Sequence, residues 1–118
     1  MLFTVKDFQK IPVSLSKETW FKKLLHPIFG HPEIEPYFSK IKSVVKKPDF
    51  VFQSVRDPRS KLFYKAKIGK GRFLDCYLVI VVKYVKEQSG LQGHISTIMF
   101  NRFLPKRGEL IWQKKAFI

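Results

Sequence analysis

The sequence predicts an α+β fold in which two N-terminal helices pack on an antiparallel β-sheet of four to five strands. Two observations lead to this fold class. Apolar residues recur at a spacing close to 3.6 up to Pro48, whereas beyond it they alternate with polar residues, as in strands. No segment between the later strands is long enough for a crossover helix, so hairpin connections are expected. With 118 residues, the chain is expected to form one domain, residues 1–118.

A short strand or arm is expected at residues 2–5, ahead of the first helix. That helix is predicted over residues 17–25, because Trp20 and Leu24 recur at helical spacing. The segment Ser14-Leu15-Ser16 offers its N-cap. A proline and a glycine that come shortly afterwards are expected to end it.

The second predicted helix begins near His31-Pro32-Glu33 and stops at Pro48. Prolines are tolerated in a first helical turn, and acidic residues suit its positive end. Lysines in the last turn suit the negative end of the helix in the same way. The apolar face of this helix consists of Ile34, Phe38, Ile41, Val44 and Val45.

The rest of the chain is expected to form the sheet. Its strand-like segments are residues 50–55, 62–68, 73–85, 93–100 and 109–112. Short segments rich in Asp, Pro, Gly and Ser separate them and are typical of turns. The continuous apolar centre of residues 73–85 places that strand in the middle of the sheet.

The charge of the chain restricts its partners. Lysine and arginine total 23 against 9 aspartate and glutamate residues, which gives a formal net charge of +14. Such a surface attracts polyanions, so nucleic acid, an anionic membrane or an acidic protein are the partners to consider. A single cysteine, Cys76, excludes an internal disulfide and a site of several thiolates. The N-terminus lacks the pattern of a signal peptide, and the longest apolar stretch is too short to span a bilayer, so a cytoplasmic protein without a membrane partner is expected.

Several short motifs succeed one another at defined separations. They are Trp20, His31-Pro32-Glu33, Lys47-Pro48-Asp49, Val51-Phe52-Gln53-Ser54, Asp57-Pro58-Arg59, Phe63-Tyr64-Lys65, Leu78-Val79-Ile80-Val81-Val82-Lys83-Tyr84, Ile95-Ser96-Thr97 and Lys106-Arg107-Gly108-Glu109-Leu110-Ile111-Trp112. Together they resemble the phage and prokaryotic members of the barnase, EndoU, colicin and RelE-like nuclease superfamily, over roughly residues 20–112. The resemblance implies a compact RelE- or barnase-like ribonuclease fold, small enough to act as a toxin and often paired with an inhibitor. We expect such an antitoxin or inhibitor protein to be acidic, or to insert a segment across the basic cleft, because opposite charge speeds docking.

The chain departs from the pattern of this superfamily at two places. Family members often carry Trp-x-x-His in the first helix, and Lys23 stands here at the position of the histidine. The strand that commonly reads Thr-Ala-Tyr is here Thr97-Ile98-Met99. Lys23 either replaces the imidazole as the cation or marks a copy with weakened or lost catalysis.

Metal-free RNA cleavage needs a group that takes the 2′-OH proton, cations for the phosphorane charge and an acid for the leaving 5′ oxygen. His31 is the leading base or acid, largely through the resemblance, since imidazole titrates near neutrality. The plain alternative is a histidine at a helix N-cap. The predicted catalytic set is completed by Lys23, Arg59, Lys65, Lys83 and Thr97.

Further residues are predicted to contact RNA without taking part in the chemistry. Tyr64 and Trp112 suit base stacking, with a place in the core as the alternative for each. The other predicted contacts are His94 at a strand start and the loop cations Lys70, Arg72, Arg102, Lys106 and Arg107. We expect no metal site and no cofactor, because no cysteine or carboxylate spacing supports His26, His31 and His94 as ligands. A small-molecule ligand is not expected either.

Three functions remain open from the sequence. The first is a metal-independent RNA endonuclease, the toxin of a toxin–antitoxin pair, that cleaves by 2′-OH attack. The second is a non-catalytic RNA- or DNA-binding module that uses the same basic sheet. The third is an interaction protein for an acidic partner.

Overall fold

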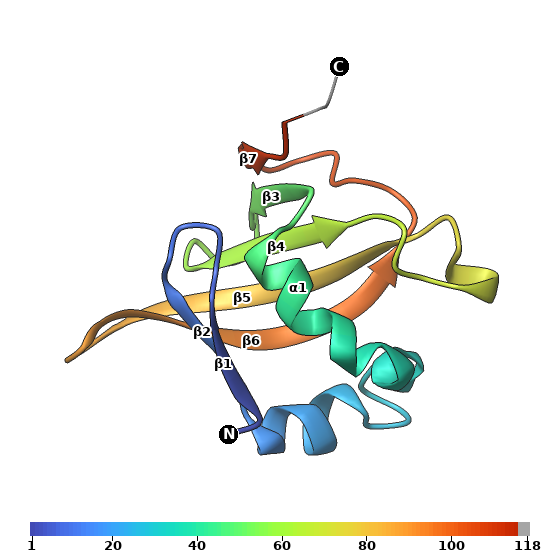
Figure 1. Cartoon of the computed structure of the whole chain (residues 1–118), viewed down its shortest axis with the longest axis horizontal. Helices are drawn as coiled ribbons and strands as arrows, with labels where there is room; N and C mark the ends of the chain where they lie inside the picture. Colours follow the sequence, from blue (N-terminus) through green and yellow to red (C-terminus); the bar gives the residue numbers. More distant parts are fainter. Residues whose placement is uncertain (116–118) are drawn as a thin grey trace.

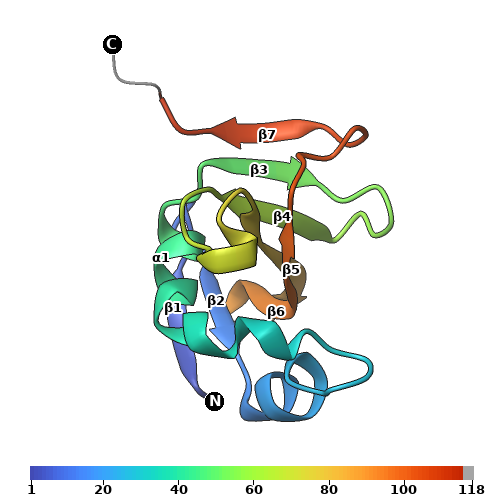
Figure 2. The same cartoon turned by 90° about the vertical axis from the view of Figure 1, so that its right-hand side faces the viewer.

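The structure, a computed structural model, describes residues 1–115 and contains a mixed sheet of seven strands. The strands lie in the order β1-β2-β6-β5-β4-β3-β7, with helical segments covering one face (Figure 1, Figure 2). They are β1 (Phe3–Lys6), β2 (Pro12–Leu15), β3 (Phe50–Gln53), β4 (Ser60–Lys65), β5 (Tyr77–Glu87), β6 (Gly90–Asn101) and β7 (Leu110–Gln113). Neighbouring strands are antiparallel except β2 and β6, which run parallel.

The helical segments are short. They are a π-helical turn (Thr19–Leu24), a 3-10 helix (Pro32–Lys40) that continues into α1 (Ile41–Lys46), and a 3-10 turn (Gly71–Phe73). Pro36 lies inside the 3-10 helix and interrupts α-helical hydrogen bonding there, because proline lacks an N–H. Within residues 1–115, none of the helices is long and apolar enough to cross a membrane.

This architecture corrects the predicted fold class. The prediction of two N-terminal helices on an antiparallel sheet of four to five strands was wrong, because the sheet has seven strands and is mixed. The first predicted helix forms only a short π-helical turn, and one continuous helical stretch of residues 32–46 comes after it. The chain begins instead with the hairpin β1–β2, and β2 joins the sheet beside β6.

The buried carboxylate of Asp7 organises this hairpin. Its Oδ1 atom accepts hydrogen bonds from the backbone N–H groups of Gln9 and Ile11, at 2.8 and 3.0 Å. Its Oδ2 atom accepts one from the Tyr84 hydroxyl on β5, at 2.6 Å. Burial and the hydrogen bond to Asp7 raise the pKa of Tyr84 far above its usual value. Asp7 therefore closes the turn and fastens it to the middle of the sheet.

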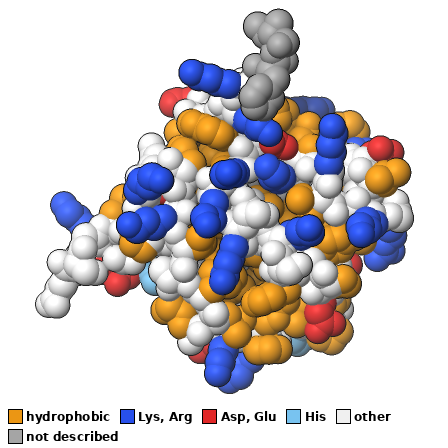
Figure 3. Space-filling view, viewed as in Figure 1, with side chains coloured by type: hydrophobic (Ala, Val, Ile, Leu, Met, Phe, Trp, Pro, Cys, Tyr) orange, Lys and Arg blue, Asp and Glu red, His pale blue; other side chains and the backbone are white. Residues whose placement is uncertain are grey.

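The main core lies between the sheet and α1. Ile41, Val44 and Val45 of α1 are fully buried against the helix-facing residues of the strands. Strand β5 contributes Leu78, Ile80 and Val82 to this core, as alternation along a strand requires. Lysine and arginine side chains gather on the outside of this helix-covered side (Figure 3).

Among residues 1–115, a second cluster of side chains covers one end of the opposite face of the sheet. There Phe52, Tyr64 and Val79 form a second buried cluster, against which Leu104 packs. Leu104 belongs to the connection that carries the chain from β6 across to β7 at the far edge of the sheet. The other end of this face, where β4 begins and β5 ends, is called the open end.

Candidate functional site

A row of polar side chains crosses the open end. The register pairs Ser60 of β4 with Lys83 of β5, Lys83 with His94 of β6, and His94 with Ser14 of β2. Residues opposite each other in neighbouring strands project to the same face, with Cβ atoms about 4.5–5.5 Å apart in antiparallel pairs. These four residues are called the polar row. Thr4 of β1 extends it, because its hydroxyl lies 2.9 Å from that of Ser14.

A β-bulge places His94 in this row. The register of β5 and β6 shifts between Val81 and Val82, and the extra residue on β6 is Ser96. Ile95 and Ile98 are therefore both buried in the core although they are three positions apart. Strict alternation from Ile98 would have turned His94 toward the core, whereas the bulge turns it outward.

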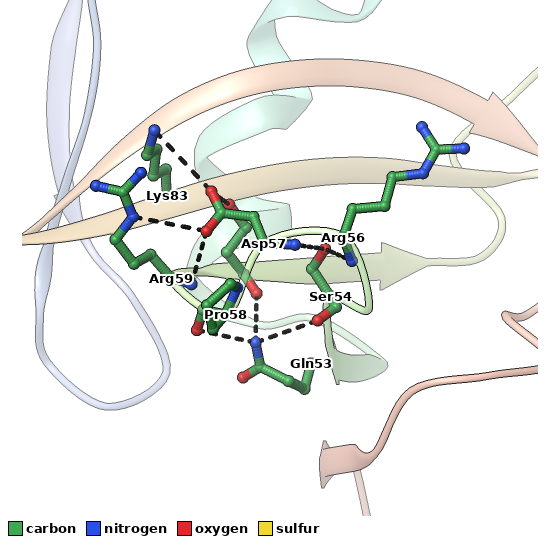
Figure 4. Close-up of polar contacts among 8 residues, drawn as sticks. Gln53, Ser54, Arg56, Asp57, Pro58, Arg59 and Lys83 are labelled. Atoms are coloured by element: carbon green, nitrogen blue, oxygen red, sulfur yellow. Dashed lines mark hydrogen bonds and ion pairs between the residues drawn. The ribbon is translucent and has the colours of Figure 1, made fainter.

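Asp57 lies at the edge of the polar row, close to the two cations Arg59 and Lys83 (Figure 4). Its carboxylate oxygens lie 3.6 Å from Arg59 Nε and 4.0 Å from Lys83 Nζ. It also accepts hydrogen bonds from the Arg59 backbone N–H at 3.0 Å and the Ser60 hydroxyl at 3.2 Å. The backbone N–H of Arg59, and to a smaller extent the Ser60 hydroxyl and the two cations, lower the pKa of Asp57. Arg59 and Lys83 remain 58% and 39% exposed, so both can reach a ligand.

Side-chain hydrogen bonds fix the shape of the loop that carries Asp57. The Gln53 amide donates to the backbone carbonyls of Ser54, Pro58 and Ser60, at 3.4, 3.1 and 3.0 Å (Figure 4). The Ser54 hydroxyl accepts hydrogen bonds from the backbone N–H groups of Arg56 and Asp57, at 3.1 and 3.2 Å. The loop therefore holds Asp57 in place before any ligand arrives.

His94 has a carboxylate partner across the β5–β6 hairpin. Its Nε2 atom lies 2.8 Å from Glu87 Oε2, and its side chain is 49% exposed. When the neutral imidazole donates Nε2–H to Glu87, the lone pair lies on Nδ1 and can accept a proton. No cluster of histidine, cysteine or carboxylate side chains that could hold a metal ion exists among residues 1–115.

Two other predicted site residues lie on this face, in different surroundings. Thr97 pairs with Val81 and is half-buried, one step along the strands from the polar row. Tyr64 is buried in the aromatic cluster, with ring centroids 5.6 Å from Phe52 and 5.8 Å from Tyr77. Its ring is therefore part of the packing rather than an exposed stacking surface.

Lys65 and Trp112 belong to the helix-covered side. The Lys65 ammonium donates to the Lys47 carbonyl at 2.7 Å and lies 3.8 Å from Asp49, so it fastens β4 to the end of α1. Trp112 packs on Phe8, with ring centroids 5.5 Å apart, next to the main core. Neither residue is placed near the polar row.

Lys23 and His31 lie together, but on the helix-covered side. His31 precedes the 3-10 helix, where its backbone N–H donates to the Leu24 carbonyl at 2.7 Å. Its Nδ1 atom lies 3.4 Å from Glu33. Lys23 is an exposed residue of the preceding π-helical turn, whose Trp20 and Leu24 are buried in the main core. The structure therefore does not bring His31 and Lys23 together with Arg59 and Lys83.

The predicted loop cations are all exposed and are divided between two loops. Arg72 lies 4.8 Å over the Phe73 ring, and the backbone N–H of Lys70 donates to the Tyr37 hydroxyl. Arg102 lines a hollow of about 200 Å³ beside Lys67. The remaining members, Lys106 and Arg107, lie in the connection from β6 to β7.

Sequence reasoning missed the acidic and hydroxyl members of the site. Asp57 was part of a turn-like segment and of the motif Asp57-Pro58-Arg59, but no role in the site was predicted for it. Ser14 and Ser60 carried no signal, because only the strand register places them beside His94 and Lys83. Glu87 carried none either, because it reaches His94 only through a side-chain contact across the folded hairpin.

Comparisons of the chain with protein-family models, with curated proteins and with solved structures find no match. The resemblance to the nuclease superfamily therefore stays a prediction from the motifs. The function must be inferred from the geometry of the polar row.

Proposed function

We propose that the protein binds RNA and cleaves it, without a metal ion, at the open end of the sheet. The observation that carries this proposal is the pairing of Lys83 with His94 in register at the open end, with Arg59 against the same Asp57 carboxylate as Lys83. A base and two cations next to one another are what attack by a 2′-OH on its own phosphodiester requires.

The residues of the row have distinct roles in this reaction. His94 takes the 2′-OH proton on Nδ1, while Glu87 orients the imidazole through its Nε2 atom. Lys83 and Arg59 stabilise the negative charge that develops on the phosphorane oxygens. Asp57 positions both cations from the side. As the 2′-oxygen bonds to phosphorus, the bond from phosphorus to the 5′ oxygen breaks, and the leaving oxygen takes a proton from water. The products are a 2′,3′-cyclic phosphate end and a 5′-hydroxyl end.

The proposal moves the catalytic histidine from His31 to His94, because His31 lies on the helix-covered side of the sheet. An acidic protein that covers the open end is the inhibitor that would fit such an enzyme, since opposite charge speeds docking. A non-catalytic RNA-binding module is the second candidate. It is favoured by the position of Asp57, which partly neutralises the two cations of the row.

Incubation of the purified protein with single-stranded RNA in excess EDTA tests the proposal. We expect cleavage with cyclic phosphate ends, and a loss of about 100-fold or more in Lys83→Ala, because the phosphorane charge then lacks its nearest ammonium. Lys86→Ala is the matched control, an exposed lysine of the same strand, and should keep the wild-type rate. Intact RNA that is nevertheless bound in a salt-sensitive way would establish the binding module instead.

A further inference from the structure

A hollow lined by lysines lies on the other side of the molecule, between the hairpin β1–β2 and the end of α1. Its volume is about 360 Å³. We call it the lysine hollow, because four lysines line it: Lys6, Lys10, Lys46 and Lys47. They come from β1, from the turn after it and from the C-terminal end of α1, and they are all exposed.

The one carboxylate in the lining does not neutralise these lysines. Asp7 is only 4% exposed, and its two oxygens already accept hydrogen bonds from Tyr84, Gln9 and Ile11. In the part of the chain that the structure describes, the ion pairs involve none of the four lysines. The lysine hollow therefore concentrates positive charge that the fold itself does not compensate.

The backbone gives no reason for a lysine at position 10, which lies in the turn between β1 and β2. Its φ is 68°, in the left-handed region where glycine or asparagine would be the unstrained choice. The negative end of α1 accounts for lysines at positions 46 and 47, but it gives no reason for Lys6 and Lys10. A residue kept in a disfavoured conformation is a reason to look for a ligand.

We infer that the lysine hollow binds backbone phosphates of the same RNA whose scissile bond lies at the open end. The inference rests on the proposed function for the identity of the polyanion. Edge strand β1 connects the two surfaces, because Thr4 extends the polar row and Lys6, two residues further on, lines the hollow. The RNA strand passes around this edge, which has no further strand beyond it among the described residues.

Salt dependence measures the number of phosphates held. For single strands, the logarithm of the binding constant falls with the logarithm of salt concentration by about 0.7 per phosphate contact. Replacing all four lysines by glutamine should therefore reduce this slope by about 2 to 3. The probe is a fluorescent 2′-O-methyl RNA of about 16 nucleotides, which binds but lacks the hydroxyl needed for cleavage.

The matched control variant carries glutamine at Lys17, Lys22, Lys40 and Lys86, which are exposed lysines outside the hollow. Both variants lose four positive charges. If both reduced the salt-dependence slope equally, net charge alone would explain the effect, and the inference would be overturned. We expect the control to change the slope by less than about 1, and arginine at the four hollow positions to restore the wild-type slope. Melting curves check that both variants are folded, and we expect the hollow variant to melt no lower than wild type, because four repelling charges have been removed.

Two further measurements separate the possible failures. Because the probe cannot be cleaved, a wild-type protein that binds it but leaves ordinary RNA intact contradicts the proposed function and not the lysine hollow. Vesicles of phosphatidylglycerol test the other source of phosphate. If the hollow variant lost vesicle binding but kept its full RNA slope, the hollow would serve a lipid surface and the inference would be overturned.

Discussion

At the scale of the residue, Asp57 determines how much charge the open end presents. It accepts two hydrogen bonds and lies between two cations, so its carboxylate both positions and partly neutralises them. An incoming phosphate must compete with this carboxylate for Lys83 and Arg59. The same contacts make the stability of the fold depend on pH in the acid range.

The sign of this dependence is set by the lowered pKa of Asp57. Its carboxylate contributes stability above the unfolded-state pKa of about 3.8, and this contribution is lost as pH falls through the lower folded-state value. We expect Asp57→Asn to be less stable than wild type at pH 7. The difference in the free energy of unfolding between the two proteins should disappear as the pH falls below about 4, as measured by urea unfolding at each pH. A difference that stayed constant down to about pH 2 would contradict this origin.

His26 holds a second tight loop, far from the row. Its Nδ1 atom accepts hydrogen bonds from the backbone N–H groups of Ile28 and Phe29, both at 3.1 Å. We expect His26→Ala to lower the free energy of unfolding by about 1 kcal/mol, whereas His26→Asn should keep most of it, because an asparagine carbonyl makes the same kind of turn. Amide exchange at Ile28 and Phe29 checks the cause. Equal losses in both variants would show that the hydrogen bonds contribute nothing.

At the scale of the element, the hairpin β1–β2 matters most, because it builds one edge of the sheet and touches both proposed RNA-binding surfaces. Two four-residue strands and the turn between them are fastened to β5 through Asp7 and Tyr84. Loss of the Asp7–Tyr84 hydrogen bond should therefore destabilise the hairpin more than the rest of the sheet.

We expect Tyr84→Phe to lower the free energy of unfolding by about 1–3 kcal/mol, because it leaves a buried Asp7 oxygen without its hydroxyl donor. Tyr64→Phe is the matched control, because Tyr64 is a buried tyrosine on the neighbouring strand whose hydroxyl does not hold a carboxylate. Hydrogen exchange should show β1 and β2 losing protection in the Tyr84 variant. Equal stability of the two variants would mean that Asp7 does not fasten the hairpin.

The elements differ in how far they could be predicted. The strands β3 to β7 lie close to the predicted segments, because period-2 apolar patterns are local signals. The hairpin β1–β2 was missed as a hairpin, since its strands have four residues each, one begins with Pro12, and its pairing with β6 is non-local. The helical period before Pro48 was real, but Pro36 and the short π-helical turn prevented two regular helices. The bulge at Ser96 had no sequence signal, so His94 and its partner Glu87 were not recognised as parts of one site.

At the scale of the whole molecule, the high net charge falls into two kinds of surface. On the open end, cations are positioned by a carboxylate, next to a histidine with a carboxylate partner of its own. On the helix-covered side, lysines of the hollow lack such partners among the described residues and are suited to hold phosphates without orienting them for reaction. In the proposed function, the open end is the place of RNA cleavage and the lysine hollow adds affinity for the RNA.

The placement of the active site at the open end is tested by the single-turnover rate of RNA cleavage in EDTA for His94→Ala and His31→Ala, with RNA bound at saturation. We expect a loss of about 100-fold or more in His94→Ala, because the base is removed, and a change of no more than a few-fold in His31→Ala. Both variants should melt within a few degrees of wild type, since the two histidines are partly exposed. Cleavage that survives in His94→Ala and disappears in His31→Ala would contradict this placement.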